Sequence, residues 1–421
     1  MPRHLKIILI FTLSLFIYSN QAAAQEILTW GDCLSGAKQN HPDLISAVED
    51  VKVQKADKVI TASGLYPQIS TDLDASTTET SAATRDSYSY GVSGSQLIFD
   101  GFKTFNEIKS AGEDIKSSRQ AYRFTSSQIR LDLRSAFVNL LKAQELIALA
   151  KEIVEIRRSS FELITLRYHS GLEHKGALLT AEANLKKADF ELNQAYREFA
   201  FRQSQLNKEM GRKEFTPLSV KGDFLVRESV KVKPDLESLV KNNPSVLQAA
   251  AQKNSSAFGI KSAYADFAPQ VSGTAGADKS GSRWPPQDNQ WNLGLGLSLP
   301  IFEGGLRFAQ VSKAEAIYNQ AEASERSITD AAIVYLQETW MSLEDAIESI
   351  DVQQKSLEAS QERSKIAEAQ YSTGFIGFDN WIIIEDDLVG AKKNYLNARA
   401  EALLAEAQWI QAKGETLEYA Q

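Results

Sequence analysis

Apolar residues occupy every second position along 291–299, and asparagine, glycine or serine fills the positions between them. A period of two is typical of a β-strand with one apolar face and one small or polar face. No proline occurs after Pro300, and no glycine occurs between Gly305 and Gly374, which predicts that a very long helix succeeds the strand. The apolar side of the strand carries Leu293, Leu295 and Leu297, and the opposite side carries Gly294, Gly296 and Ser298.

Large and small apolar residues recur at alternating spacings of four and three along 129–154. The same spacing returns in the segments that begin at Leu185 and Leu388. A repeat of 3.5 residues predicts helices that pack along a coiled-coil seam, and the alanines in it permit close approach. The predicted helices 102–168 and 306–371 would each be roughly 100 Å long at about 1.5 Å per residue, which exceeds the diameter of an ordinary domain.

The two halves of the chain repeat one another. Matching residues lie 202 positions apart near the start of each half and 203 positions apart from the motif IFDG or IFEG onward. This recurrence predicts a tandem duplication. The matched pairs include Pro42 with Pro244, Pro67 with Pro269, Phe99 with Phe302, Tyr168 with Tyr371, and Gly171 with Gly374.

Each copy is predicted to contain a helix, two strands, a very long helix, a turn and a second long helix. The first repeat covers 25–212, the second covers 234–421 with a short carboxyl-terminal tail, and 213–233 joins them as an equatorial segment. The expected strands are 67–77, 87–99, 269–279 and 290–302, and the expected long helices are 102–168, 175–212, 306–371 and 379–413.

The amino terminus has the pattern of an export signal. Arg3 and Lys6 precede an apolar run at 7–18, and three alanines at 22–24 form a small-residue cleavage site. We expect a signal peptide over 1–24, whose apolar part is too short to span a bilayer. A lipid anchor would need a cysteine directly after the cleavage site, whereas the only cysteine is Cys33, for which we expect a buried position.

Charge and motifs argue against several functions. The chain has 54 acidic and 46 basic residues, an excess of negative charge that argues against nucleic-acid binding. His169 and His174 lack the context of a metal site, and the glycines at 294–296 do not fit a dinucleotide loop. We therefore expect no enzyme, cofactor or metal. The acidic run 385–387 is either a solvated helix face or a charged ring in a pore.

Four strands cannot close a barrel, and an open sheet edge in lipid leaves backbone groups unsatisfied, each at a cost of several kcal/mol. The strands must therefore combine with those of other chains. Two chains give eight strands, three give twelve and four give sixteen. Eight-stranded barrels are filled by side chains, so the small residues along 294–298 favour a larger barrel with an open lumen.

The chain resembles the TolC family of outer-membrane efflux channels. The residues that carry the resemblance are the signal peptide, the N-x-P opening of each half, the PQ-[IV]-S strand entries, the [IL]-F-[DE]-G strand exits and the Y-x-x-G turns. It spans residues 26–413. It implies a protein that is mainly α with a membrane β part: a tandem-repeat protomer of a homotrimer, with a 12-stranded outer-membrane β-barrel continued by a 12-helix periplasmic α-barrel.

The resemblance also implies a function. The trimer would be the exit duct of a tripartite efflux or type I secretion system, embedded in outer-membrane lipid and extending into the periplasm. Its partners would be a periplasmic membrane-fusion adaptor and an inner-membrane transporter of the RND or ABC type, and its cargo would be drugs, metals or secreted proteins. The alternative is a periplasmic coiled-coil structural or adaptor protein.

Particular residues acquire roles from the resemblance. The adaptor would dock at Tyr168, Gly171, Tyr371 and Gly374. Leu293, Leu295 and Leu297 would face lipid, whereas Gly294, Gly296 and Ser298 would face the lumen. The family commonly has gate aspartates nine and twelve residues after the second tip tyrosine, but here those positions are Asn380 and Ile383. We expect these two to form the constriction, with a negative ring at Asp387 on the same helical face and Asp379 as the alternative ring.

Overall fold

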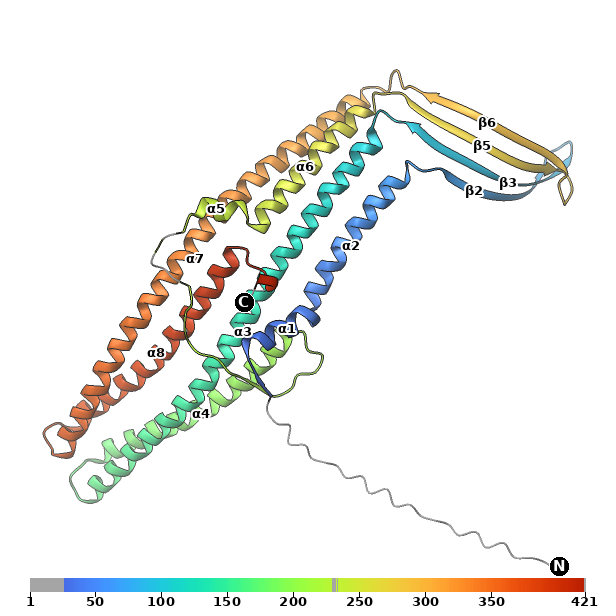
Figure 1. The fold of residues 1–421 in the computed structure, drawn as a ribbon. Coiled ribbons are helices and arrows are strands. Elements are labelled where there is room, and N and C mark those ends of the chain that lie inside the picture. Colours follow the sequence, from blue (N-terminus) through green and yellow to red (C-terminus); the bar gives the residue numbers. More distant parts are fainter. Residues whose placement is uncertain (1–25, 229–231, 233, 420–421) are drawn as a thin grey trace, which may run out of the picture.

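The computed structural model describes residues 26–228, 232 and 234–419, so the expected signal peptide lies outside the described residues. The molecule is long and narrow, with a β-sheet at one end and two helical hairpin tips at the other (Figure 1). Among the described residues, no helix has both the length and the apolar character to cross a membrane.

The four-stranded sheet has the order β2-β3-β5-β6, and all its neighbours are antiparallel. The register shifts at Leu97 and Phe99, where β3 has a bulge against β5. The last strand ends at Ser298, before the expected limit of 302, because Pro300 has no backbone N–H to donate. The strands are β2 (Gln68–Glu79), β3 (Thr84–Phe99), β5 (Gln270–Gly281) and β6 (Asp288–Ser298).

The strand register gives the sheet two chemically different faces, because residues opposite each other in an antiparallel sheet share a face. Leu293 pairs with Ala275, which pairs with Gly94. Gly294 pairs with Thr274, which pairs with Ser95. One face therefore combines leucine, valine, alanine and aromatic residues, and the other combines serine, threonine, aspartate and glycine.

The helices repeat in length between the two halves. The short helices α2 (Pro42–Ser63) and α6 (Pro244–Ala265) have 22 residues each. The long helices α3 (Lys103–His169) and α7 (Leu306–Ser372) have 67 each, and the returning helices α4 (Lys175–Glu209) and α8 (Phe378–Ala412) have 35 each.

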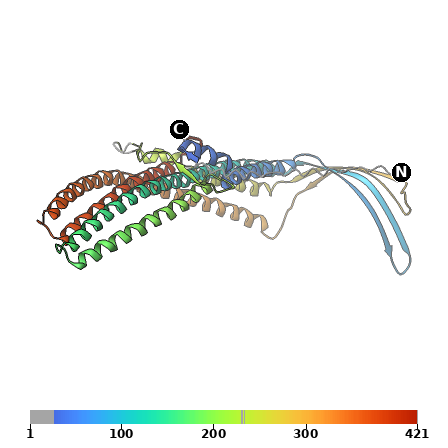
Figure 2. The same ribbon diagram turned by 90° about the horizontal axis from the view of Figure 1, so that it is seen from below.

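The helices lie side by side in one layer (Figures 1 and 2). Near the sheet their order is α2-α3-α6-α7, and toward the tips it is α4-α3-α8-α7. The predicted seam on α3 is buried along most of its length, from Ile129 and Leu133 to Ala150 and Val154. The coiled-coil spacing therefore identified the face of α3 that packs against its neighbours.

Two helix ends meet two helix starts at mid-length. The α4 end lies against the α2 start, where Glu209 is 3.7 Å from the His41 imidazole. The α8 end lies against the α6 start, where the Asn243 amide donates to the Ala412 carbonyl at 3.1 Å. Together α4 with α2, and α8 with α6, form two interrupted columns beside the continuous columns α3 and α7.

Short elements gather around this middle level. Strand β1 (Glu26–Leu28) pairs in parallel with β4 (Leu218–Val220), and helix α1 (Trp30–Asn40) lies beside them. Helix α5 (Leu236–Lys241) contacts α7, and the 3-10 helix η1 (Leu417–Tyr419) contacts α3.

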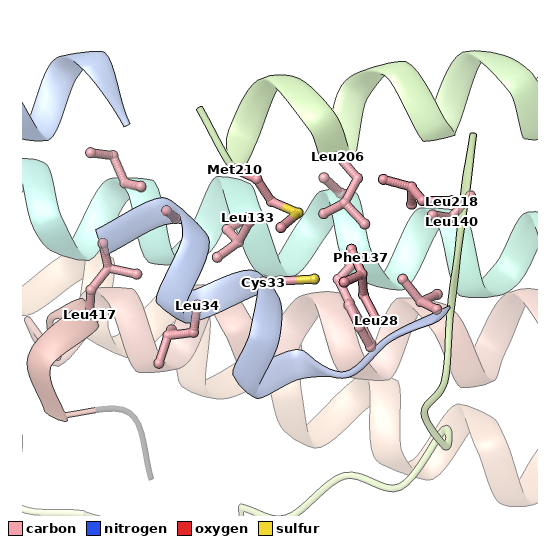
Figure 3. Packing of buried hydrophobic residues seen from close by; sticks show 14 of the residues in the cluster. Leu28, Cys33, Leu34, Leu133, Phe137, Leu140, Leu206, Met210, Leu218 and Leu417 are labelled. Atoms are coloured by element: carbon pink, nitrogen blue, oxygen red, sulfur yellow. The ribbon is translucent and has the colours of Figure 1, made fainter. Parts of the chain in front are cut away.

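A buried apolar cluster holds this middle level together (Figure 3). Cys33, Leu133, Leu206 and Leu417 are all fully buried in it. The burial expected for Cys33 is confirmed, and burial raises the pKa of its thiol to about 12. Leu417 comes from the carboxyl-terminal end of the second repeat, so this cluster joins the two halves.

Candidate functional site

Both hairpin tips reverse direction through the same backbone motif. Gly171 and Gly374 have φ angles of 74° and 82°, which lie in the left-handed region that glycine adopts without a steric penalty. The N–H of Leu172 bonds to the Arg167 carbonyl at 2.9 Å, and the N–H of Phe375 bonds to the Gln370 carbonyl at 2.8 Å. These are the bonds of a Schellman helix end, and they explain why the sequence has Y-x-x-G at both tips.

Tyr371 lies inside the tip rather than on its surface. Its side chain is almost fully buried, with the ring stacked on Trp381 at a centroid distance of 4.5 Å. Its hydroxyl donates to Glu173 at 2.9 Å, and the Arg167 guanidinium lies 4.7 Å from the ring centre. Burial, together with the bond to Glu173, raises the pKa of Tyr371.

The burial of Tyr371 separates it from the tip surface, and adaptor docking at the tips stays a prediction. In this conformation the residue links the α7 end to the turn between α3 and α4, and a partner cannot reach its ring. Tyr168, its counterpart in the first repeat, is half-buried beside His169. The exposed apolar side chains at the tips include Leu172, with 67% of its surface accessible, and Phe375, with 84%. The sequence signal for them was their position directly after each tip glycine.

The acidic residues 385–387 after the second tip differ in how deeply they are buried. Glu385 is buried and accepts hydrogen bonds from Arg157 and from the Ser160 hydroxyl, the latter at 2.7 Å. Asp386 also pairs with Arg157 but remains largely exposed. Burial raises the pKa of Glu385 even though Ser160 and Arg157 favour its charged form. Neither expected description of the run, a solvated face or a pore ring, is right for Glu385, which fastens α8 to α3.

The expected gate residues share an exposed helical face. Asn380, Ile383 and Asp387 are all exposed on α8, and 57% of the Ile383 surface is accessible. Asp387 accepts a hydrogen bond from Arg363 on α7 at 3.3 Å. Asp379 is exposed in the first turn of α8 and lies one residue around the helix from Asn380.

His174 has a structural task at the first tip. Its Nδ1 atom accepts the N–H of Ala177 at 3.1 Å and so caps the amino-terminal end of α4. In the part of the chain that the structure describes, no group of three or more histidine, cysteine, aspartate or glutamate residues is arranged to hold a metal ion.

The expected lipid-facing residues of β6 have no partner above them in the protomer. Leu293, Leu295 and Leu297 are 79%, 80% and 72% exposed. Gly294 and Gly296 lie on the opposite face, in register with Thr274 and Ser272. Large apolar side chains this exposed indicate a face that is covered by something other than water.

Comparisons with known proteins identify the family. The sequence profile "Outer membrane efflux protein" matches residues 33–212 and 236–415, so one unit of the family corresponds to each half of the duplication. The chain is 23% identical to the outer membrane efflux protein BepC of Brucella suis, over 95% of this chain and 85% of that protein. It is 24% identical to the outer membrane protein OprJ of Pseudomonas aeruginosa, over 89% of this chain and 77% of that protein.

Solved structures agree with this assignment at the level of the fold. The CmeC outer membrane channel of Campylobacter jejuni superimposes with a TM-score of 0.83 at 16% identity, over 91% of this chain and 85% of that one. The MtrE outer membrane channel of Neisseria gonorrhoeae, in its open state, gives 0.81 at 17% identity, over 91% and 88%. The family places the protein in the outer membrane with its helices extending into the periplasm. The chain belongs to the outer membrane efflux protein family, which is the TolC family that its motifs resemble.

Proposed function

We propose that three copies of this chain close head to tail into one duct, which passively conducts substrates delivered from the inner membrane. The supporting observation is that the sheet and the helical layer both have unpaired edges, and that these edges lie on the same two sides of the protomer. The sheet ends at β2 on one side and β6 on the other. The helical layer ends at α2 and α4 on one side and α7 on the other. A ring of protomers pairs all these edges at once, and in lipid it removes the cost of an open sheet.

The strand count excludes two copies, and the family supports three rather than four. Two copies would give an eight-stranded barrel, whose interior is filled by side chains. Three copies give twelve strands and, because four helices lie side by side at each level, a tube wall of twelve helices. Channels of this family are trimers, which supports three copies rather than four.

The different chemistry of the two sheet faces supports one face toward the barrel lumen and the other toward lipid. The face with Leu293, Leu295 and Leu297 is suited to lipid, because its side chains are apolar and exposed. The face with Gly294, Gly296 and Ser298 is suited to a water-filled lumen, because its rows continue through serine, threonine and aspartate. Outer-membrane barrels alternate in this way along every strand.

Partners would join the duct at the tips. Relatives are named for efflux and for protease secretion, which supports a periplasmic adaptor and an inner-membrane transporter, of the RND or ABC type, as partners. Leu172 and Phe375 offer exposed apolar contacts for an adaptor, and Gly171 and Gly374 hold them there. Tyr371 would not contact the adaptor itself. It would connect one tip to the other through its hydrogen bond to Glu173.

A constriction would form just above the second tip. Asn380 and Ile383 from three chains would narrow the duct, and Asp387 would place a negative ring about one helical turn deeper. Arg363 lies 3.3 Å from the Asp387 carboxylate and offsets part of its charge. Asp379 is the alternative source of the ring.

The test combines assembly with conductance. Amine cross-linking of detergent-solubilised protein should give a species of three chains, and planar bilayers should show cation-selective channels. Asp387→Ala should reduce the cation selectivity, while Asp379→Ala, a matched carboxylate two turns away, should change it less. A stable monomer with native strand content would contradict the proposed duct. A larger effect of Asp379→Ala would assign the ring to that residue instead.

A further inference from the structure

A basic residue lies on the more apolar face of the sheet. The register places Lys279 of β5 opposite Tyr90 of β3 and Asn289 of β6, in the row next to Ala277 and Trp291. It is the one lysine or arginine on that face within the described strands. The side chain is exposed, and no ion pair involves it among the described residues. An unpaired ammonium on an apolar face calls for an anion or for water.

The depth of Lys279 matches the edge of a membrane. Strand β5 runs away from the helices, and Lys279 lies eight positions after Val271. This is about 27 Å along a strand, or about 20 Å of height at the ~40° tilt of barrel strands. The apolar band of outer-membrane barrels is about 25 Å tall. With the helices in the periplasm and this face toward lipid, that height would bring Lys279 near the outer-leaflet end of the band.

Aromatic side chains surround the same place. The Trp284 ring packs against Tyr88 and Tyr90, with centroid distances of 6.2 Å and 6.0 Å. This contact holds the loop between β5 and β6 against the apolar face. Arg283, next to Trp284, is exposed and, like Lys279, makes no ion pair within the described part of the chain. Trp and Tyr with adjacent Lys and Arg are the side chains that favour the boundary between acyl chains and headgroups.

Nearby carboxylates do not neutralise these two cations. Asp278 and Asp288 belong to the opposite, polar face of the sheet. Asp86 shares the apolar face but lies two rows further out on the other hairpin, where it accepts a hydrogen bond from Thr77 at 2.8 Å. Glu79 is at the outer end of that same hairpin. Neither cation is therefore paired with a carboxylate in the described part of the chain, although the net charge of the chain is −8.

We propose that Lys279 and Arg283, framed by Tyr88, Tyr90 and Trp284, bind the phosphate groups of an outer-leaflet glycolipid. The inference rests on the proposed function, because it takes the apolar face of the sheet to be the lipid-facing one. The aromatic rings lie beside the sugar and upper acyl region of the lipid. The ammonium and guanidinium groups donate charge-assisted hydrogen bonds to its phosphate oxygens. Three such sites encircle the trimer and fix its height in the outer leaflet.

The experiment compares two lipids that differ only in phosphate. Detergent-purified protein is titrated with bis-phosphorylated lipid A or with the same lipid lacking both phosphates, and native mass spectrometry counts the bound lipid. The phosphorylated lipid should bind at least tenfold more tightly. The double variant Lys279→Gln, Arg283→Gln should lose this preference. Arg85→Gln is the matched control, because Arg85 is an exposed basic residue at the same end of the sheet but on its polar face.

Two results would overturn the proposal. One is a double variant that keeps the full preference for phosphate. The other is an equal loss in Arg85→Gln, which would mean that the lipid responds to charge on either face. Conductance of the same preparations in phosphatidylcholine bilayers tests the duct separately. Channels that conduct but show no preference for the phosphorylated lipid would overturn the headgroup site and leave the proposed duct standing.

Discussion

Arg157 and Arg363 make similar-looking contacts in very different surroundings. Arg157 pairs with Glu385 where both side chains are more than nine-tenths buried. Arg363 pairs with Asp387 where both are half-exposed. A buried charge that loses its partner keeps its desolvation cost, whereas an exposed charge returns to water. The two pairs therefore contribute differently to holding α8 in the helical layer.

Replacing each arginine by methionine should show this difference. Arg157→Met should destabilise the tip by about 3–5 kcal/mol, because it leaves the Glu385 carboxylate buried without a counter-charge. Arg363→Met should cost at most about 1 kcal/mol. Denaturant midpoints followed by circular dichroism measure both effects. Adding Glu385→Gln to Arg157→Met should recover part of the loss, and no recovery would mean that Arg157 acts through packing rather than charge.

At the scale of elements, the carboxyl-terminal segment fastens the second repeat to α3. The Glu418 carboxylate accepts from the Tyr122 hydroxyl at 2.6 Å and from the Ser126 hydroxyl at 3.0 Å. Glu415 pairs with Arg130 at 2.9 Å. The three α3 residues are four positions apart and so share one face of the helix. Leu417 anchors the segment in the buried cluster between these contacts.

These contacts should open in acid. Burial raises the pKa of Glu418, but its hydrogen bonds outweigh burial and the net pKa is below the ordinary 4.5. For Glu415, burial is likewise outweighed by Lys413 and Arg130. A lowered pKa in the folded state means that the stabilisation is complete above pH 4.5 and is lost as the pH falls through the lowered value.

Hydrogen exchange at 417–419, corrected for its intrinsic pH dependence, measures the release. Protection should be high at pH 7 and should fall below pH 4.5. Glu418→Gln should already exchange faster at pH 7, because it removes the charge that Tyr122 and Ser126 favour. Protection that is unchanged down to pH 3 would show that Leu417 burial alone holds the segment.

For the whole molecule, the decisive property is which face of the sheet meets lipid. Leu295→Arg should destabilise the assembled barrel by about 2–4 kcal/mol, because it places a charge in the apolar band. Gly296→Arg should leave assembly intact and reduce conductance, because its side chain would project into the lumen. The yield of cross-linked trimer and the single-channel conductance measure the two effects. Equal behaviour of the two variants would contradict the assignment of faces.

The periodicity of apolar residues predicted the long helices and the strands because this signal lies within each segment of the sequence. The 3.5-residue spacing located the buried seam of α3, and the alternation at 291–299 located β6. Contacts between distant residues carry no such signal. Nothing near Glu385 in the sequence indicates that Arg157, 228 positions earlier, will pair with it in a buried contact, so the burial of this one member of the acidic run was not predicted. Likewise, Y-x-x-G marked both turns but could not show that Tyr371 would turn inward onto Trp381.

The corresponding helices of the two halves have equal lengths of 22, 67 and 35 residues. These lengths determine how far the helical part of the protomer extends into the periplasm. The continuous columns α3 and α7 determine the length of the helical part. The interrupted columns must have the same total length to pack along them. An insertion in one helix alone would misalign its seam with both neighbours. Seven residues added to α3, α4, α7 and α8 together would preserve every seam and lengthen the tube by about 10 Å. A change in the length of this tube that keeps its helices in register would therefore need matched insertions in both halves of the chain.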